Sequence, residues 1–206
     1  MKALIARRLA DTRPAPPEVY RVPGIAGDLP ASLQRLRPAR LVPAAVLLPI
    51  VERPEGFTML FTVRAPDLRH HAGQVSFPGG RLDPQDAGPR EAALREAAEE
   101  VGLPEHLVEV VGYLPNYLTI TGFSVTPVVG FVQPSFHATP DAKEVSEAFE
   151  VPLDCLLEPG NMQLCHKRFL GVRLPYYEMP WGPHRIWGAT AAMLVNFRDL
   201  LRGELQ

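Results

Sequence analysis

Three glutamates, Glu96, Glu99 and Glu100, lie close together near the middle of this 206-residue chain. Pro89 and Gly102 bracket them, and these residue types are typical of the first turn and of the end of a helix. Positions i, i+3 and i+4 share one helix face, so the three carboxylates should converge, although like charges at this spacing repel. The spacing therefore predicts a bound Mg²⁺ or Mn²⁺ ion, which prefers oxygen ligands, against the alternative of a solvated acidic face.

The segment before this helix has the residue types of a loop that faces the same ions. A short extended run ends at Phe77, two glycines follow Pro78, and Asp86 lies in the loop before the helix begins. Glycine permits backbone geometries that bulkier residues resist. We therefore expect the backbone carbonyl of Gly80 to be a further metal ligand beside the three carboxylates.

Composition limits the classes of partner. The chain is long enough for one well-buried domain, and its net charge is −2. That charge gives no general attraction to nucleic acid or to acidic membranes, so neither is an expected partner. Cys155 and Cys165 fit no zinc or redox spacing, and no apolar run reaches the ~20 residues that span a bilayer. We expect a cytoplasmic protein.

The order of strand-like and helix-like segments predicts an α/β fold with a mixed sheet. Residues 1–40 are expected to form a short helix followed by a proline-rich arm, and residues 41–206 to form the main domain. A helix interrupted by Pro152 is expected over 145–157, and a regular helix over 189–202. The expected extended segments are 44–51, 57–64, 74–77, 108–114, 124–132, 169–174 and 184–187.

The loop and helix resemble the conserved box of the Nudix hydrolase family, GX5EX7REUXEEXGU, where U is an aliphatic residue. Gly80 and the run from Arg95 to Leu103 follow this pattern, whereas Asp86 replaces the usual glutamate and the spacer after it is one residue longer. Whether Asp86 takes the usual partner role to Arg95 stays open. The resemblance implies a Nudix-type α/β/α sandwich with a mixed β-sheet that hydrolyses a diphosphate with Mg²⁺ or Mn²⁺.

Residues 62–80, TVRAPDLRHHAGQVSFPGG, resemble the signature LLTXR(S/A)X3RX3GX3FPGG of Nudix enzymes that cleave coenzyme A. This resemblance implies a coenzyme A diphosphatase (pyrophosphatase) that releases 3′,5′-ADP and 4′-phosphopantetheine from coenzyme A or its acyl or oxidised derivatives. Arg64, Arg69 and Phe77 are the expected substrate-binding residues, although each arginine alone would equally suit an ion pair with a nearby acid. The positions in register are Thr62, Arg64, Ala65, Arg69, Gly73, Phe77, Pro78, Gly79 and Gly80.

The resemblance also implies catalytic roles. Glu96 and Glu100 are expected to bind the metal ions, with Glu99 as a third ligand and first candidate for the general base. Arg95 completes the expected catalytic set, and Glu144 is the alternative base. ADP-ribose, a nucleotide sugar or a nucleoside triphosphate are alternative substrates, and a ligand-binding module without catalysis is a further alternative. Apolar faces on both terminal helices leave a homodimer open.

Overall fold

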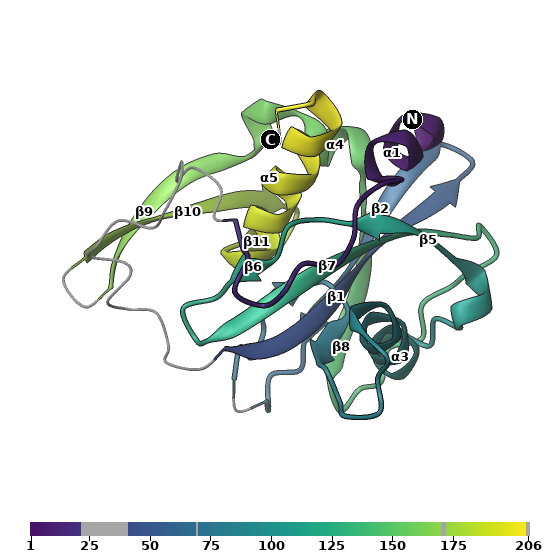
Figure 1. The fold of residues 1–206 in the computed structure, drawn as a ribbon, viewed down its shortest axis with the longest axis horizontal. Helices are drawn as coiled ribbons and strands as arrows, with labels where there is room; N and C mark the ends of the chain where they lie inside the picture. Colours follow the sequence, from purple (N-terminus) through teal and green to yellow (C-terminus); the bar gives the residue numbers. More distant parts are fainter. Residues whose placement is uncertain (22–40, 69, 170–171, 205–206) are drawn as a thin grey trace.

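The computed structural model describes residues 1–21, 41–68, 70–169 and 172–204. An eight-stranded mixed sheet runs through the centre, with helices on both faces and a three-stranded sheet beside it (Figure 1). This architecture confirms the predicted α/β class with a mixed sheet and flanking helices. Within the described ranges, no helix is both long enough and apolar enough to cross a bilayer.

Strands β1 (Val42–Arg53) and β2 (Gly56–Arg64) contain the predicted extended segments 44–51 and 57–64 and form an antiparallel hairpin. β1 also runs parallel to β7 (Phe123–Val132), and the main path of the sheet is β3-β2-β1-β7-β5. β4 (Gly79–Arg81) pairs with the first half of β1, so the two glycines of the loop lie within the sheet. β3 (Val75–Ser76), β5 (Val108–Tyr113) and β6 (Tyr117–Leu118) belong to the same sheet.

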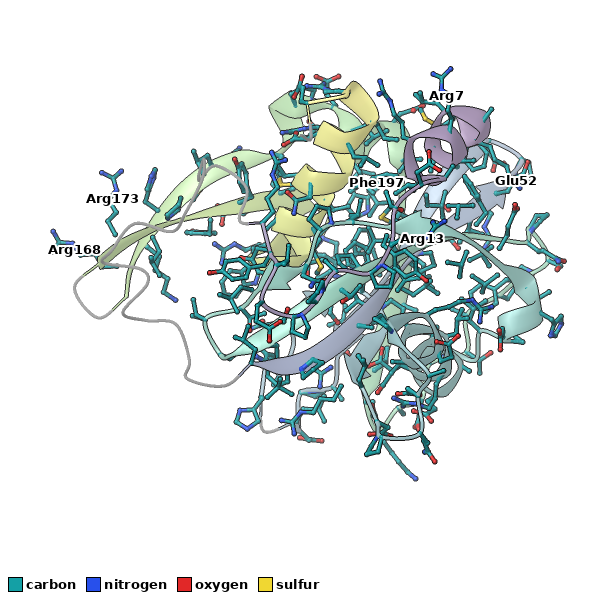
Figure 2. The ribbon with its side chains drawn as sticks, viewed as in Figure 1. Arg7, Arg13, Glu52, Arg168, Arg173 and Phe197 are labelled. Carbon is teal, nitrogen blue, oxygen red and sulfur yellow. The ribbon has the colours of Figure 1, made fainter. Side chains whose placement is uncertain are left out.

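Alternate residues of β1 face two separate core layers, as the two-residue period of a strand requires. Leu47 packs with the core beneath α3 (Pro89–Val101), whereas Leu48 packs with the core beneath α5 (Ala189–Arg202). Figure 2 labels Phe197, the buried ring that α5 adds to the second layer. The predicted N-terminal helix is confirmed as α1 (Lys2–Leu9), which packs on the α5 side. Two short 3₁₀ helices are η1 (Glu105–Leu107) and η2 (Pro159–Asn161).

The helix predicted over 145–157 is wrong in its first half. Residues Val145–Pro152 form strand β8, which pairs with β2, and only Leu153–Leu157 form a helix, α4. The register places Phe149 opposite Phe61, and their rings stack with centroids 5.6 Å apart. Strand pairing and aromatic packing thus override a glutamate-rich local sequence that favours helix.

The C-terminal region forms a three-stranded sheet that is larger than the short extended segments predicted there. Its strands are β9 (Gln163–Phe169), β10 (Val172–Trp181) and β11 (His184–Trp187), in the order β11-β10-β9. The β9–β10 hairpin projects from the body of the molecule (Figure 1). After β11, the hydroxyl of Thr190 in the first turn of α5 donates a hydrogen bond of 3.0 Å to the Val75 carbonyl, which ties this region to β3.

The N-terminal arm is held against the sheet by buried side chains, those of Ser124, whose hydroxyl donates to the Pro17 carbonyl at 2.7 Å, and of Asn116, which is 1 % exposed. Its Oδ1 accepts a 2.8 Å hydrogen bond from the Thr126 hydroxyl. Its amide nitrogen donates to three carbonyls of the arm, those of Ala15, Pro16 and Val19. The sequence predicted the arm but not the residues that hold it. The rest of the predicted arm, residues 22–40, lies outside the described residues.

Candidate active site

Helix α3 carries the carboxylates, and its ends follow the sequence prediction. Pro89 occupies the first turn, where its missing N–H costs no hydrogen bond. Gly102 ends the helix in the left-handed conformation with φ 66°, and its N–H bonds to the Ala98 carbonyl at 3.1 Å. The buried residues Ala93, Ala97 and Val101 anchor α3 on the sheet. In this orientation Glu96 and Glu100 lie against the glycines of β4.

Glu100 is a buried carboxylate, 2 % exposed, at the centre of the site. Burial raises its pKa to about 8. The Gly79 N–H, which donates to Oε2 at 3.3 Å, and the Arg64 guanidinium, 3.9 Å from Oε1, oppose that rise. The negative charges of Glu96 and Glu144 add to it. A positive charge placed among these carboxylates would stabilise the ionised form.

Glu96 lies directly against Gly80. A Cβ atom at position 80 would come within 2.2 Å of the Glu96 Oε1, so only glycine allows this approach of backbone and carboxylate. Burial raises the pKa of Glu96, the adjacent Arg95 opposes the rise, and Glu99 and Glu144 add to it. The predicted proximity of the Gly80 backbone to the acidic cluster is therefore present in the structure.

Arg95 fastens the loop to the helix. Its Nε and Nη2 donate to the two carboxylate oxygens of Asp86 at 3.2 and 3.0 Å, and Nη2 also donates to the Arg81 carbonyl at 3.2 Å. Hydrogen bonding from Arg95 lowers the pKa of Asp86. Asp86 thus takes the partner role to Arg95 that the sequence left open, in spite of its shorter side chain and the longer spacer. A bidentate pair of this kind is geometrically specific.

The two candidates for the general base occupy different surroundings. Glu99 is 58 % exposed and accepts a 3.1 Å hydrogen bond from Arg95. Glu144 lies in the loop before β8, where its carbonyl accepts the Ala65 N–H at 2.8 Å. The Asp141 N–H of the same loop donates to the Glu100 carbonyl at 2.9 Å, which attaches the loop to α3. Because this loop is attached to α3, the negative charge of Glu144 is held where it raises the pKa of Glu96 and of Glu100.

The clustered carboxylates fit a hard divalent cation, which prefers oxygen ligands. Within the described ranges, no three His, Cys, Asp or Glu side chains already converge as ligands of one ion. Glu96 and Glu99 instead contact Arg95, and Glu100 contacts the Gly79 N–H. Glu96 and Glu100 also have raised pKa values, chiefly because burial disfavours their charged forms, and neighbouring carboxylates add to this effect.

The predicted substrate-binding residues have three different outcomes. Arg64 ends β2 beside Glu100, and its buried Nε has no hydrogen-bond partner among the described residues. Phe77 is 2 % exposed and stacks on Phe61 with ring centroids 5.0 Å apart. This burial corrects the predicted substrate contact, because the ring supports the loop from within the core. Arg69 lies outside the described residues.

Comparison with known proteins assigns the family. The NUDIX domain family matches residues 41–170. The chain is 47 % identical over 154 residues to an uncharacterized Nudix hydrolase, NudL, of Klebsiella pneumoniae, covering 73 % of this chain and 78 % of the relative. A NudL protein of Salmonella newport is 46 % identical over 155 residues, with the same coverage.

A solved structure shares the fold. The MutT protein of Methanosarcina mazei Go1 superimposes with a TM-score of 0.51 at 19 % identity, over 81 % of this chain and 97 % of that one. Together with the family match and the matching relatives, the loop and helix described above show that this chain belongs to the Nudix hydrolase family, which acts on small molecules that contain a diphosphate.

Proposed function

We propose that this protein is a coenzyme A diphosphatase, which hydrolyses the diphosphate of coenzyme A and of its acyl or oxidised derivatives to 3′,5′-ADP and a 4′-phosphopantetheine. Family membership supports the class of bond. The observation that supports coenzyme A as the substrate is the position of Arg64. This residue of the coenzyme A signature ends 3.9 Å from the buried Glu100 of the Nudix helix, so the signature and the acidic cluster form one site.

The acidic cluster would hold Mg²⁺ or Mn²⁺ through Glu96, Glu99 and Glu100, together with the Gly80 carbonyl. The bound ion would neutralise phosphate charge and lower the pKa of a bound water. Arg95 keeps the loop in place through Asp86, which preserves the contact between Gly80 and Glu96. Positioning and charge neutralisation are the main demands of attack at phosphorus.

Arg64 would bind the substrate diphosphate. Its Nε is a buried donor without a partner in the described part of the chain, and such donors are costly unless a ligand satisfies them. A guanidinium group can donate two parallel hydrogen bonds to phosphate oxygens, which lysine cannot. Arg69, from the same signature, is proposed as the second phosphate contact.

Glu99 is our first candidate for the general base, because it is the exposed carboxylate of the cluster and its position on α3 is fixed. Glu144 is the second candidate, since its charge acts on both Glu96 and Glu100. Separate Glu99→Gln and Glu144→Gln variants distinguish them. The variant that lacks the base loses the acidic limb of the pH–rate profile as well as rate, by about 10²- to 10⁴-fold.

A substrate panel tests the proposed function. Coenzyme A, ADP-ribose, a nucleotide sugar and a nucleoside triphosphate are compared by kcat/KM with Mg²⁺ or Mn²⁺ present. We expect coenzyme A to rank first, and Arg64→Lys to lower its kcat/KM by about tenfold or more through loss of bidentate binding. Preferential cleavage of another diphosphate would overturn the substrate assignment. Metal binding without any turnover would favour a non-catalytic module.

A further inference from the structure

The C-terminal sheet has one face that the core does not cover. Side chains alternate along its strands, so Met179 and Ile186 point into the core, where both are buried. The register then places four other side chains together on the opposite face. This aromatic–basic face consists of Lys167, Tyr176, Arg185 and Trp187, with Glu178 between them.

We propose that the aromatic–basic face binds the 3′-phosphoadenosine end of the substrate while the acidic cluster holds the diphosphate. This inference rests on the proposed function, because it assigns a second contact region for the same molecule. The ligand class is a purine ring that carries a phosphate monoester.

The rings and cations of this face are already arranged around one another. The Arg185 Cζ lies 5.1 Å from the Trp187 ring centroid and 5.9 Å from that of Tyr176. The two rings meet edge to face with centroids 6.1 Å apart, and the Lys167 Nζ lies 6.0 Å from the Trp187 centroid. Partly exposed aromatic rings beside cations are the combination that stacks a base and binds its phosphate.

The charge of the aromatic–basic face favours an anion. The face carries two cations, Lys167 and Arg185, against one carboxylate, Glu178, in a chain whose net charge is −2. Arg185 forms a hydrogen-bonded ion pair with Glu178, which partly neutralises its charge. Lys167 is exposed, and no carboxylate of the described residues forms an ion pair with it. Its ammonium group is therefore the one that the phosphate would engage.

The aromatic–basic face is attached to the strand that leads into the acidic cluster. Trp187 ends β11, and three residues later Thr190 is hydrogen-bonded to Val75 of β3. Val75 in turn lies four residues before Gly79, the residue whose N–H contacts Glu100. On the same strand as Trp187, His184 stacks on Phe149 with ring centroids 3.9 Å apart. These contacts fix the face relative to the site, as simultaneous binding of both ends of one substrate requires.

Adjacent residues of β9 provide a matched pair of variants. Lys167 lies on the aromatic–basic face, whereas Arg168 pairs with Arg173 on the other face, and both arginines extend from the tip of the hairpin (Figure 2). Lys167→Ala and Arg168→Ala remove the same charge from neighbouring positions. Each variant is assayed with coenzyme A and with the same molecule lacking its 3′-phosphate.

We expect Lys167→Ala to raise KM for coenzyme A by about fivefold, the effect of one partly exposed charged contact, with kcat unchanged. KM for the molecule without the 3′-phosphate should not change, and Arg168→Ala should affect neither substrate. Equal effects of the two variants would overturn the inference, because general electrostatic attraction would then explain them. Equal effects of Lys167→Ala on both substrates would also overturn it.

A binding measurement separates this inference from the proposed function. The chain has two tryptophans, so Trp181→Phe leaves Trp187 as the fluorescent reporter. We expect 3′,5′-ADP to quench this fluorescence at lower concentration than 5′-AMP, and Lys167→Ala to abolish the difference. Such binding without cleavage of coenzyme A would support the proposed nucleotide site on the aromatic–basic face but overturn the proposed function. Cleavage of coenzyme A with equal quenching by both nucleotides would overturn the nucleotide site alone.

Discussion

We predict that Gly80→Ala, which disturbs the contact between Gly80 and Glu96, lowers the catalytic rate of this protein far more than its stability. An alanine Cβ at position 80 would lie 2.2 Å from the Glu96 Oε1, and real Cβ atoms essentially never come within 3.0 Å of such an atom. The carboxylate must therefore retreat by about 0.8 Å, the difference between these two distances. Because the displaced atoms are the end of a flexible side chain, we expect Gly80→Ala to cost less than about 1 kcal/mol of unfolding free energy.

The same displacement should be costly for catalysis, because a misplacement of about 1 Å at a reacting centre lowers the rate by about a hundredfold. The assay is kcat for diphosphate hydrolysis at saturating metal, beside the denaturant midpoint of the same sample. Gly160→Ala is the control, since a Cβ there meets no atom within 4 Å. A Gly80→Ala enzyme with kcat within about threefold of wild type would refute the role of this contact.

Other contacts give further expected outcomes. Asn116→Ala should lower the unfolding free energy by about 1–3 kcal/mol, because it removes three hydrogen bonds to the arm and leaves the buried Thr126 hydroxyl without its acceptor, and limited proteolysis should then cut within the arm. Burial would raise the pKa of Glu150, but hydrogen bonds from Arg53 and Thr58 hold it below its usual 4.5. The interaction of Glu150 with Arg53 and Thr58 therefore stabilises the fold above about pH 4.5, and this stabilisation is lost as the pH falls through the lower folded-state pKa. Glu150→Gln should make the thermal melting temperature fall less steeply over this acid range. Mg²⁺ or Mn²⁺ at about 100 times its Kd should stabilise the protein by about 2.7 kcal/mol, and Glu96→Gln should remove most of that gain.

The parts of the site that local sequence specifies were predictable. Pro89 and Gly102 mark the ends of α3 by backbone chemistry alone, and the helix period then places Glu96 and Glu100 on one face. The parallel pairing of β1 with β7 is a long-range feature, yet both strands were predicted from their apolar runs.

The parts that depend on distant partners were not predictable in the same way. β8 has a helix-like composition, and only its pairing with β2 shows that it is a strand. Asn116 carries no local signal of its role, because its partners lie about a hundred residues earlier in the chain. The burial of Phe77 likewise depends on Phe61 of a neighbouring strand, and no spacing rule distinguishes a core ring from a pocket wall.

Product analysis with coenzyme A tests the central claim most directly. The wild-type protein and Glu100→Gln are incubated with coenzyme A and Mg²⁺ or Mn²⁺, and the products are separated and identified. The account predicts equal amounts of 3′,5′-ADP and 4′-phosphopantetheine from the wild type and a severe loss of both from the variant. Intact coenzyme A alongside rapid cleavage of ADP-ribose or a nucleotide would contradict the substrate assignment, and undiminished turnover by Glu100→Gln would contradict the carboxylate site.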